Sequence, residues 1–236
     1  MSSTLTHMPR PIQRIIALVV FAIFIFAGGP WIFINFIKDK APSAFELQPS
    51  STSTVIENVT DVNGDWSVIA AGNSMVGYRV KEVLFGQSTE GVGRTKFVDG
   101  DLTIANNSVT KASFTVQMAS FMSDAAKRDA QFNNRIMDVM SYPTSTFTLS
   151  SPIALPDNAT SGQVISTEAS GQLTLRGVTK DVKFPLQAQL TGSTFTVVGS
   201  ITIVFDEWGI PEPGLPGITV NPEGLLEFSL EFSRQS

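Results

Sequence analysis

Residues 171–190 have the sequence GQLTLRGVTKDVKFPLQAQL, and this stretch decides the fold. Apolar and polar residues alternate along both of its halves, which is the pattern of strands with one dry face and one wet face. Gly177 stands where the chain must reverse, and Lys180 and Asp181 place polar side chains in the turn. The stretch therefore predicts an antiparallel hairpin whose dry face covers an apolar interior.

The rest of the C-terminal region repeats this alternation. We expect further strands over residues 66–68, 74–84, 92–104, 108–118, 144–150, 194–205 and 218–232. Short alternating strands in succession are typical of an all-β sandwich or barrel.

One interval breaks the alternation and predicts a short helical insert. Ser123 is expected to cap the helix, and Tyr142-Pro143 to stop it. Large apolar residues at helical spacing form one face of this insert, namely Phe132, Ile136, Val139 and Met140. This face closes one end of the sheet structure, either as a movable lid or as an ordinary plug.

The N-terminal region predicts a membrane anchor. Residues 15–37 carry no charged side chain, and a run of that length spans a bilayer as one helix. A secretory signal has a shorter apolar region before its cleavage site, so an uncleaved signal-anchor is favoured over a cleaved signal at Ala27-Gly28-Gly29. The predicted division is a cytoplasmic N-terminus (1–14), a transmembrane anchor (15–37), a linker (38–64) and an extracytoplasmic β domain (65–236), which makes a single-pass protein of the cell membrane.

The segment GQLTLRGVTK at residues 171–180 resembles the signature of the YceI-like family, polyisoprenoid-binding proteins with a lipocalin-like barrel. Other stretches that resemble the family are Trp66-Ser-Val68, Asn73-Ser74, Gly77-Tyr-Arg-Val80, Gly86, Gly91-Val-Gly93, Lys127-Arg-Asp129 with Phe132, Tyr142-Pro143 with Thr146-Phe147, and Asp206 with Trp208-Gly-Ile210. The chain departs from the family in lacking a histidine beside Ser74 and another after the strand of Tyr78.

The resemblance implies an eight-stranded antiparallel barrel with a long apolar cavity. It also implies a ligand with an isoprenoid tail, such as a quinone or a polyprenyl phosphate. Alternation alone does not distinguish a cavity from a packed core. Two functions therefore stay open at this point: a tethered lipid-binding protein for carriage or storage, and a structural or interaction module with a packed barrel.

The candidate ligand-binding residues are large apolar side chains on the dry faces and on the helical insert. They are Tyr78, Val80, Phe97, Phe114, Val116, Met118, Phe132, Ile136, Met140, Phe147, Leu173, Leu175, Phe184, Leu186, Phe195, Val197, Ile201 and Ile203. A lipid cavity needs many such walls and few polar groups. Lys127-Arg128-Asp129 is expected either to hold a polar head group at the mouth or, as the favoured alternative, to form a charge-paired helix start.

Composition excludes several other functions. The chain has no cysteine, and its one histidine, His7, precedes the apolar segment, which argues against thiol and histidine chemistry. Net charge is −5 without clustered Lys and Arg, so nucleic acid is not an expected partner. We predict no enzyme, no metal, no cofactor other than a bound isoprenoid lipid, and no particular oligomeric state.

Overall fold

The computed structural model describes residues 12, 14–16, 18–19, 40–47, 62–70, 72–84, 86–156, 162–212 and 218–235. Most of the predicted anchor (15–37) lies outside these ranges, as do residues 1–11 and much of the linker. No helix within the described ranges is long and apolar enough to cross a membrane. The anchor and the cellular location therefore stay predictions.

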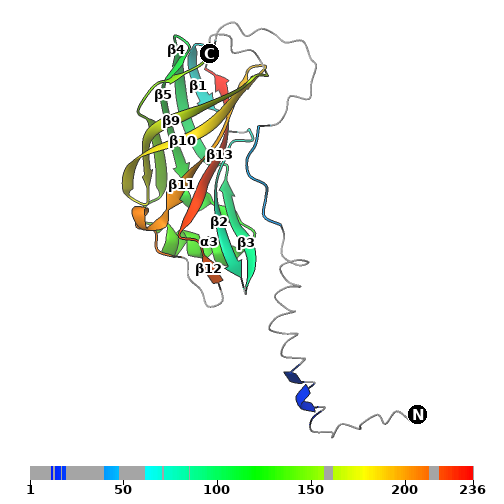
Figure 1. Cartoon of the computed structure of the whole chain (residues 1–236). Helices are drawn as coiled ribbons and strands as arrows, with labels where there is room; N and C mark the ends of the chain where they lie inside the picture. Colours follow the sequence, from blue (N-terminus) through cyan, green and yellow to red (C-terminus); the bar gives the residue numbers. More distant parts are fainter. Residues whose placement is uncertain are drawn as a thin grey trace, which may run out of the picture.

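The described residues form an antiparallel sheet with short helical segments, as the alternation predicted (Figure 1). The strands are β1 (Gly64–Val68), β2 (Met75–Leu84), β3 (Gln87–Thr95), β4 (Val98–Ala105), β5 (Ser108–Gln117), β6 (Met122–Ser123), β7 (Thr144–Leu149), β8 (Ile153–Ala154), β9 (Val164–Leu175), β10 (Val178–Thr191), β11 (Thr194–Val204), β12 (Ile218–Val220) and β13 (Glu223–Arg234). The helical segments are η3 (Met118–Ser120), α3 (Ala126–Gln131), η4 (Phe132–Ile136) and η5 (Phe205–Trp208).

The sheet closes into an eight-stranded barrel, which confirms the predicted fold of the domain. The ring runs β1-β4-β5-β7-β9-β10-β11-β13 and closes where β1 pairs with β13. Strand β13 also pairs with β2 over residues 225–229, so β1 and β2 follow one another along the same edge of β13. Strand β3 pairs with β2 and with the short β6, which leads into α3.

The hairpin of β9 and β10 reverses in two residues. Leu175 pairs with Val178, and the turn residues Arg176 and Gly177 have φ angles of 50° and 75°. Two successive positive φ angles are the signature of a type I′ turn, whose twist matches that of the strands. Lys180 and Asp181 were predicted to lie in the turn, which is wrong, because both belong to β10 and the two-residue turn leaves no room for them.

Two predicted strands are interrupted. The strand expected over residues 92–104 breaks after Thr95, where the Thr95 Oγ1 accepts a hydrogen bond from the amide of Phe97 at 3.0 Å, and resumes at Val98. The strand expected over 218–232 breaks between β12 and β13 at Asn221-Pro222. Proline lacks the amide that a ladder needs, which accounts for the second break.

The helical insert is shorter than predicted. Helix α3 has Ala125 as its N-cap, without a side-chain cap, so the prediction that Ser123 caps the helix is wrong. The Ser123 hydroxyl instead donates to Asp129 at 2.6 Å, and the Ser123 amide donates to the same carboxylate at 2.9 Å. After α3 the chain widens into the one-turn π-helix η4, in which the amide of Met137 donates to the carbonyl of Phe132.

Candidate functional site

The inward faces of the barrel strands enclose a cavity of about 570 Å³. This volume lies within the range of roughly 300–1,000 Å³ typical of small-molecule sites. Strands β2, β4, β5, β7, β9, β10, β11 and β13 all contribute apolar side chains to its wall. The interior of the barrel is therefore an apolar compartment and not a filled core.

Phenylalanines from separate strands form a continuous part of this wall. The ring of Phe147 on β7 lies 5.5 Å from that of Phe184 on β10, with an interplanar angle of 70°. Phe184 in turn lies 5.8 Å from Phe228 on β13, again edge to face. Phe114 on β5 lies 6.4 Å from Phe147. The edge-to-face contacts have the geometry that aromatic quadrupoles favour, and Phe114 and Phe147 are stacked with an interplanar angle of 15°.

Glycines on neighbouring strands make room for these rings. A Cβ at Gly100 would lie 2.3 Å from the ring of Phe114, and a Cβ at Gly199 would lie 2.6 Å from the ring of Phe228. Both distances are shorter than a carbon–carbon contact allows. These positions therefore require glycine for the wall aromatics to lie flat against the sheet.

The mouth of the cavity lies beside α3, because the charged lining residues gather there. They are Glu82, Asp124, Lys127 and Arg128. Figure 1 shows α3 at the same end of the barrel as β12 and the adjoining ends of β2 and β3. At the opposite end, Trp66, Ile104 and Leu190 are buried but do not line the cavity, so they fill the barrel beyond it.

The charged group at the mouth is paired within the protein. Arg128 donates to Asp124 one turn earlier and to Glu82 on β2 at 3.2 Å. Asp129 accepts from Ser123, as described above. These contacts favour the charge-paired helix start over a head-group clamp, and they tie α3 to the barrel wall.

Three stacked rings line the cavity beside the mouth. Tyr78 stacks on Phe132 of η4 at 5.0 Å with an interplanar angle of 14°, and Phe121 lies 5.0 Å from Phe132. The pKa of Tyr78 is raised to about 12, mainly by burial. Arg128 and Ser123 act to lower this pKa, and Asp129 and Glu82 act to raise it. The Tyr78 phenol is therefore a neutral hydrogen-bond donor at the wall.

Most candidate residues lie on the cavity wall. Those that line it are Tyr78, Val80, Phe114, Val116, Met118, Phe132, Ile136, Phe147, Leu173, Leu175, Phe184, Leu186, Phe195, Val197, Ile201 and Ile203. Their position is consistent with ligand binding, which itself stays a prediction.

The prediction that Phe97 and Met140 lie in the barrel interior is wrong. Phe97 is 66% exposed because it falls in the break between β3 and β4, where the alternation does not apply. Met140 is 92% exposed because the helical period ends with η4 at Ile136, four residues earlier. Neither residue lines the cavity.

Sequence reasoning missed the wall that β13 contributes. Its inward residues are Leu226, Phe228, Leu230 and Phe232, and all of them line the cavity. The signal was present, because these residues alternate with polar ones along the last strand. Further lining residues that the candidate set omitted include Val76, Val98, Leu102, Phe121, Ile165 and Ala169.

The adjacent carboxylates Asp206 and Glu207 lie outside the cavity. Asp206 and Glu207 belong to η5 and not to a strand, and both are exposed. Glu207 forms an ion pair with Lys180 at 3.0 Å. Within the described ranges, no group of three or more His, Cys, Asp or Glu side chains is placed to hold a metal ion.

Comparison with known proteins agrees with this architecture. Residues 66–232 match the YceI-like domain family. The chain belongs to the YceI-like family. The match covers the complete barrel, from β1 into β13, and it confirms the resemblance that the segment at residues 171–180 indicated. A search of curated protein sequences finds no match.

Solved structures share the fold of this YceI-like domain. BcnA of Burkholderia cenocepacia is 22% identical with a TM-score of 0.56, and the alignment covers 70% of this chain and 98% of BcnA. A polyisoprenoid-binding domain from Saccharophagus degradans, implicated in plant cell wall breakdown, is 16% identical with a TM-score of 0.59, covering 72% and 98%. The Campylobacter jejuni YceI protein is 16% identical with a TM-score of 0.52, covering 61% and 85%.

Proposed function

We propose that this protein is a membrane-tethered, extracytoplasmic binding protein that holds an isoprenoid-tailed lipid, of the quinone or polyprenyl phosphate type, for carriage or storage. The observation that carries the proposal is the apolar cavity of about 570 Å³ inside the barrel. Each methylene moved from water into such a cavity contributes about 0.8 kcal/mol. A long tail therefore binds without any catalytic or charged group in the interior.

Two further features support this function over a packed structural module. The family is one of binding proteins, and one structural neighbour is described as a polyisoprenoid-binding domain. The charged lining residues gather at one end, which suits a ligand with a polar head and an apolar tail. The chain has no cysteine and its one histidine, His7, precedes the barrel, so binding alone is proposed and no reaction.

The test is lipid extraction from protein purified without detergent. The chain from Lys40 onward is expressed with an export signal, purified in aqueous buffer and extracted with organic solvent for mass spectrometry. We expect an isoprenoid-tailed lipid in near-stoichiometric amount. A folded barrel that is consistently empty would support the packed-module alternative and refute the proposal.

Two matched variants make this test specific for the cavity. Ala169 is buried on the cavity wall and pairs with Phe184, so Ala169→Phe places a second ring inside. Glu168 is the preceding residue and its side chain points outward, with 59% of its surface exposed, so Glu168→Phe adds the same ring outside. We expect Ala169→Phe to lose bound lipid and Glu168→Phe to retain it.

A further inference from the structure

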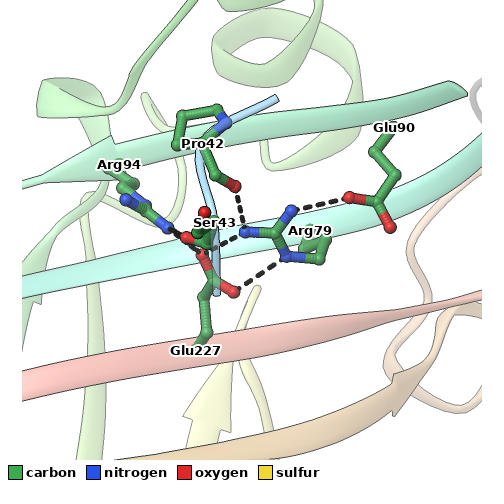
Figure 2. Close-up of polar contacts among 6 residues, drawn as sticks. All are labelled: Pro42, Ser43, Arg79, Glu90, Arg94 and Glu227. Carbon is green, nitrogen blue, oxygen red and sulfur yellow. Dashed lines mark hydrogen bonds and ion pairs between the residues drawn. The ribbon is translucent and has the colours of Figure 1, made fainter. Parts of the chain in front are cut away.

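A cluster of charged residues lies on the outer face of the barrel, and two of its members, Arg79 and Glu227, are buried there although outer side chains normally meet water. Glu227 on β13 is only 2% exposed and accepts hydrogen bonds from two arginines (Figure 2). Arg79 donates to it through Nε at 3.0 Å, and Arg94 donates through Nη2 at 2.9 Å. Arg79 also donates to Glu90 at 2.7 Å. The four charges balance within this cluster.

Strand register and one glycine bring these residues together. Gly77 pairs with Glu227 on one side and with Arg94 on the other. A Cβ at Gly77 would lie 3.0 Å from Cγ of Arg94 and 3.3 Å from Cγ of Glu227. The missing side chain therefore opens the space in which the arginine and the carboxylate meet across β2.

Residues 40–47, which we call the strap, cover this cluster. The carbonyl oxygen of Pro42 accepts a hydrogen bond from Nη2 of Arg79 at 2.7 Å, and the carbonyl of Ser43 accepts one from Arg94 (Figure 2). The ring of Phe45 lies 4.0 Å from the Arg94 guanidinium carbon in a cation–π contact. The barrel thus binds the strap through main-chain carbonyls and one aromatic ring.

The N-terminal end of the strap points toward the mouth of the cavity. Lys40, Ala41 and Pro42 line a small pocket together with Met122, Ser123 and Asp124. The last three residues lead directly into α3, which forms the mouth. In Figure 1 the strap runs beside β2 and β3 toward the end of the barrel that carries α3 and β12.

We propose that the docked strap orients the barrel so that its mouth faces the membrane that residues 15–37 are predicted to span. This inference rests on the proposed function. Lys40 follows Ile37 by three residues, a distance of at most about 11 Å in an extended chain. An undocked linker of residues 38–63 has a mean reach of roughly 30 Å and no preferred direction.

The docked strap has a direct consequence for ligand exchange. A mouth held against the bilayer lets an apolar tail pass from lipid to cavity with little contact with water. A mouth turned away exposes the tail at a cost of about 0.8 kcal/mol per methylene. The docked strap thereby holds the barrel in the orientation in which a tail can pass directly from the bilayer into the cavity.

The orientation is measured with single-cysteine probes, since the chain has no native cysteine. Ala130→Cys places a fluorophore on the exposed side of α3, outside the cavity lining. Ser193→Cys places the same fluorophore in the exposed turn between β10 and β11, at the opposite end. The full chain is reconstituted into phosphatidylcholine vesicles that contain phosphatidylcholine with a nitroxide-labelled head group, which quenches nearby fluorophores.

We expect the α3 probe to be quenched several-fold more than the turn probe. Replacing residues 40–47 by a Gly/Ser sequence of equal length should make the two probes almost equally quenched, so that the ratio of α3-probe quenching to turn-probe quenching falls close to one. The same replacement of residues 50–57, which leaves the strap intact, should preserve it. Equal quenching in the unaltered chain, a ratio that survives strap replacement, or failure of the chain to float with vesicles would each overturn the inference.

The lipid-extraction experiment separates this inference from the proposed function. A barrel that holds lipid but shows equal quenching at both ends retains the proposed function and refutes the role of the strap. A barrel that is oriented but consistently empty refutes the proposed function and leaves the strap as a device that positions the domain.

Discussion

The two faces of strand β13 have different surroundings, although side chains on both are shielded from solvent. Phe228 points inward and lines the cavity, whereas Glu227, its neighbour in sequence, points outward and is buried against two arginines. The inward face borders open apolar space, and the outward face is densely hydrogen-bonded beneath the strap. In this domain, tight polar packing lies outside the barrel, and the interior is left free for a ligand.

Glu227→Ala is the substitution expected to weaken the outer face most. It leaves the guanidinium groups of Arg79 and Arg94 without their shared carboxylate in a buried site, which typically costs about 3–5 kcal/mol. Urea unfolding of the chain from Lys40 onward measures the loss. Glu168→Gln, which breaks the exposed pair with Lys183, is the control and should cost less than about 1 kcal/mol. Equal losses for the two variants would show that burial does not distinguish them.

Phe228→Ala tests the inner face of the same strand. The ring packs on Phe184 and covers Gly199, so its removal is expected to cost about 3 kcal/mol. This is the low end of the usual range because the side of the ring that faces the cavity has few packing partners. The same unfolding experiment measures it, with Ser229→Ala expected to change stability by less than about 0.5 kcal/mol. A loss above that of Glu227→Ala would reverse the proposed ranking of the two faces.

Tyr78 on the inner face is expected to make the stability of the barrel depend on pH. Its pKa is raised to about 12 from an ordinary value of 10.0, mainly by burial, so the folded state keeps a proton that the unfolded state loses. The resulting stability is fully present below pH 10 and is lost as the pH rises through 12. The loss amounts to about 2–3 kcal/mol and should be absent in Tyr78→Phe. Parallel stability curves for the two proteins between pH 10 and 12 would contradict this assignment.

Phe45→Ala is the smallest expected effect and probes the strap alone. Loss of the cation–π contact with Arg94 should cost about 1 kcal/mol, while the backbone contacts of Pro42 and Ser43 remain. Phe45→Tyr keeps the ring and should leave stability nearly unchanged in the same assay. Equal losses from both variants would mean that the ring face is not what binds Arg94.

The alternation of residues was sufficient to predict the barrel and most of its wall. Successive side chains of a strand point to opposite faces, so alternation alone predicts which ones face inward. This correctly placed Leu173, Leu175, Phe184 and Leu186 on the cavity wall. The same logic failed at Phe97, where the strand breaks and the phase is lost. It failed at Met140 because a helical period was carried past the actual end of η4.

The outer cluster had no signal in the sequence. Arg79 and Glu227 are separated by 148 residues, and each occupies an ordinary outward position of an alternating strand. Only the pairing of β2 with β13 brings them together, and the strap then contacts Arg79 through the carbonyl of Pro42. Residues 40–47 were predicted to belong to the linker, because their hydrogen bonds to the barrel use main-chain carbonyls, which every sequence possesses.

The pairing of β1 with β13 also governs when the cavity comes into existence. Trp66 pairs with Arg234, so the ring joins the first strand of the domain to the last. A nascent chain that has not yet released β13 presents open strand edges, with β1, β2 and β11 all lacking a neighbour. The cavity therefore forms only after the whole of β13 has been synthesised. Truncation within β13 would abolish the compartment and not merely make it smaller.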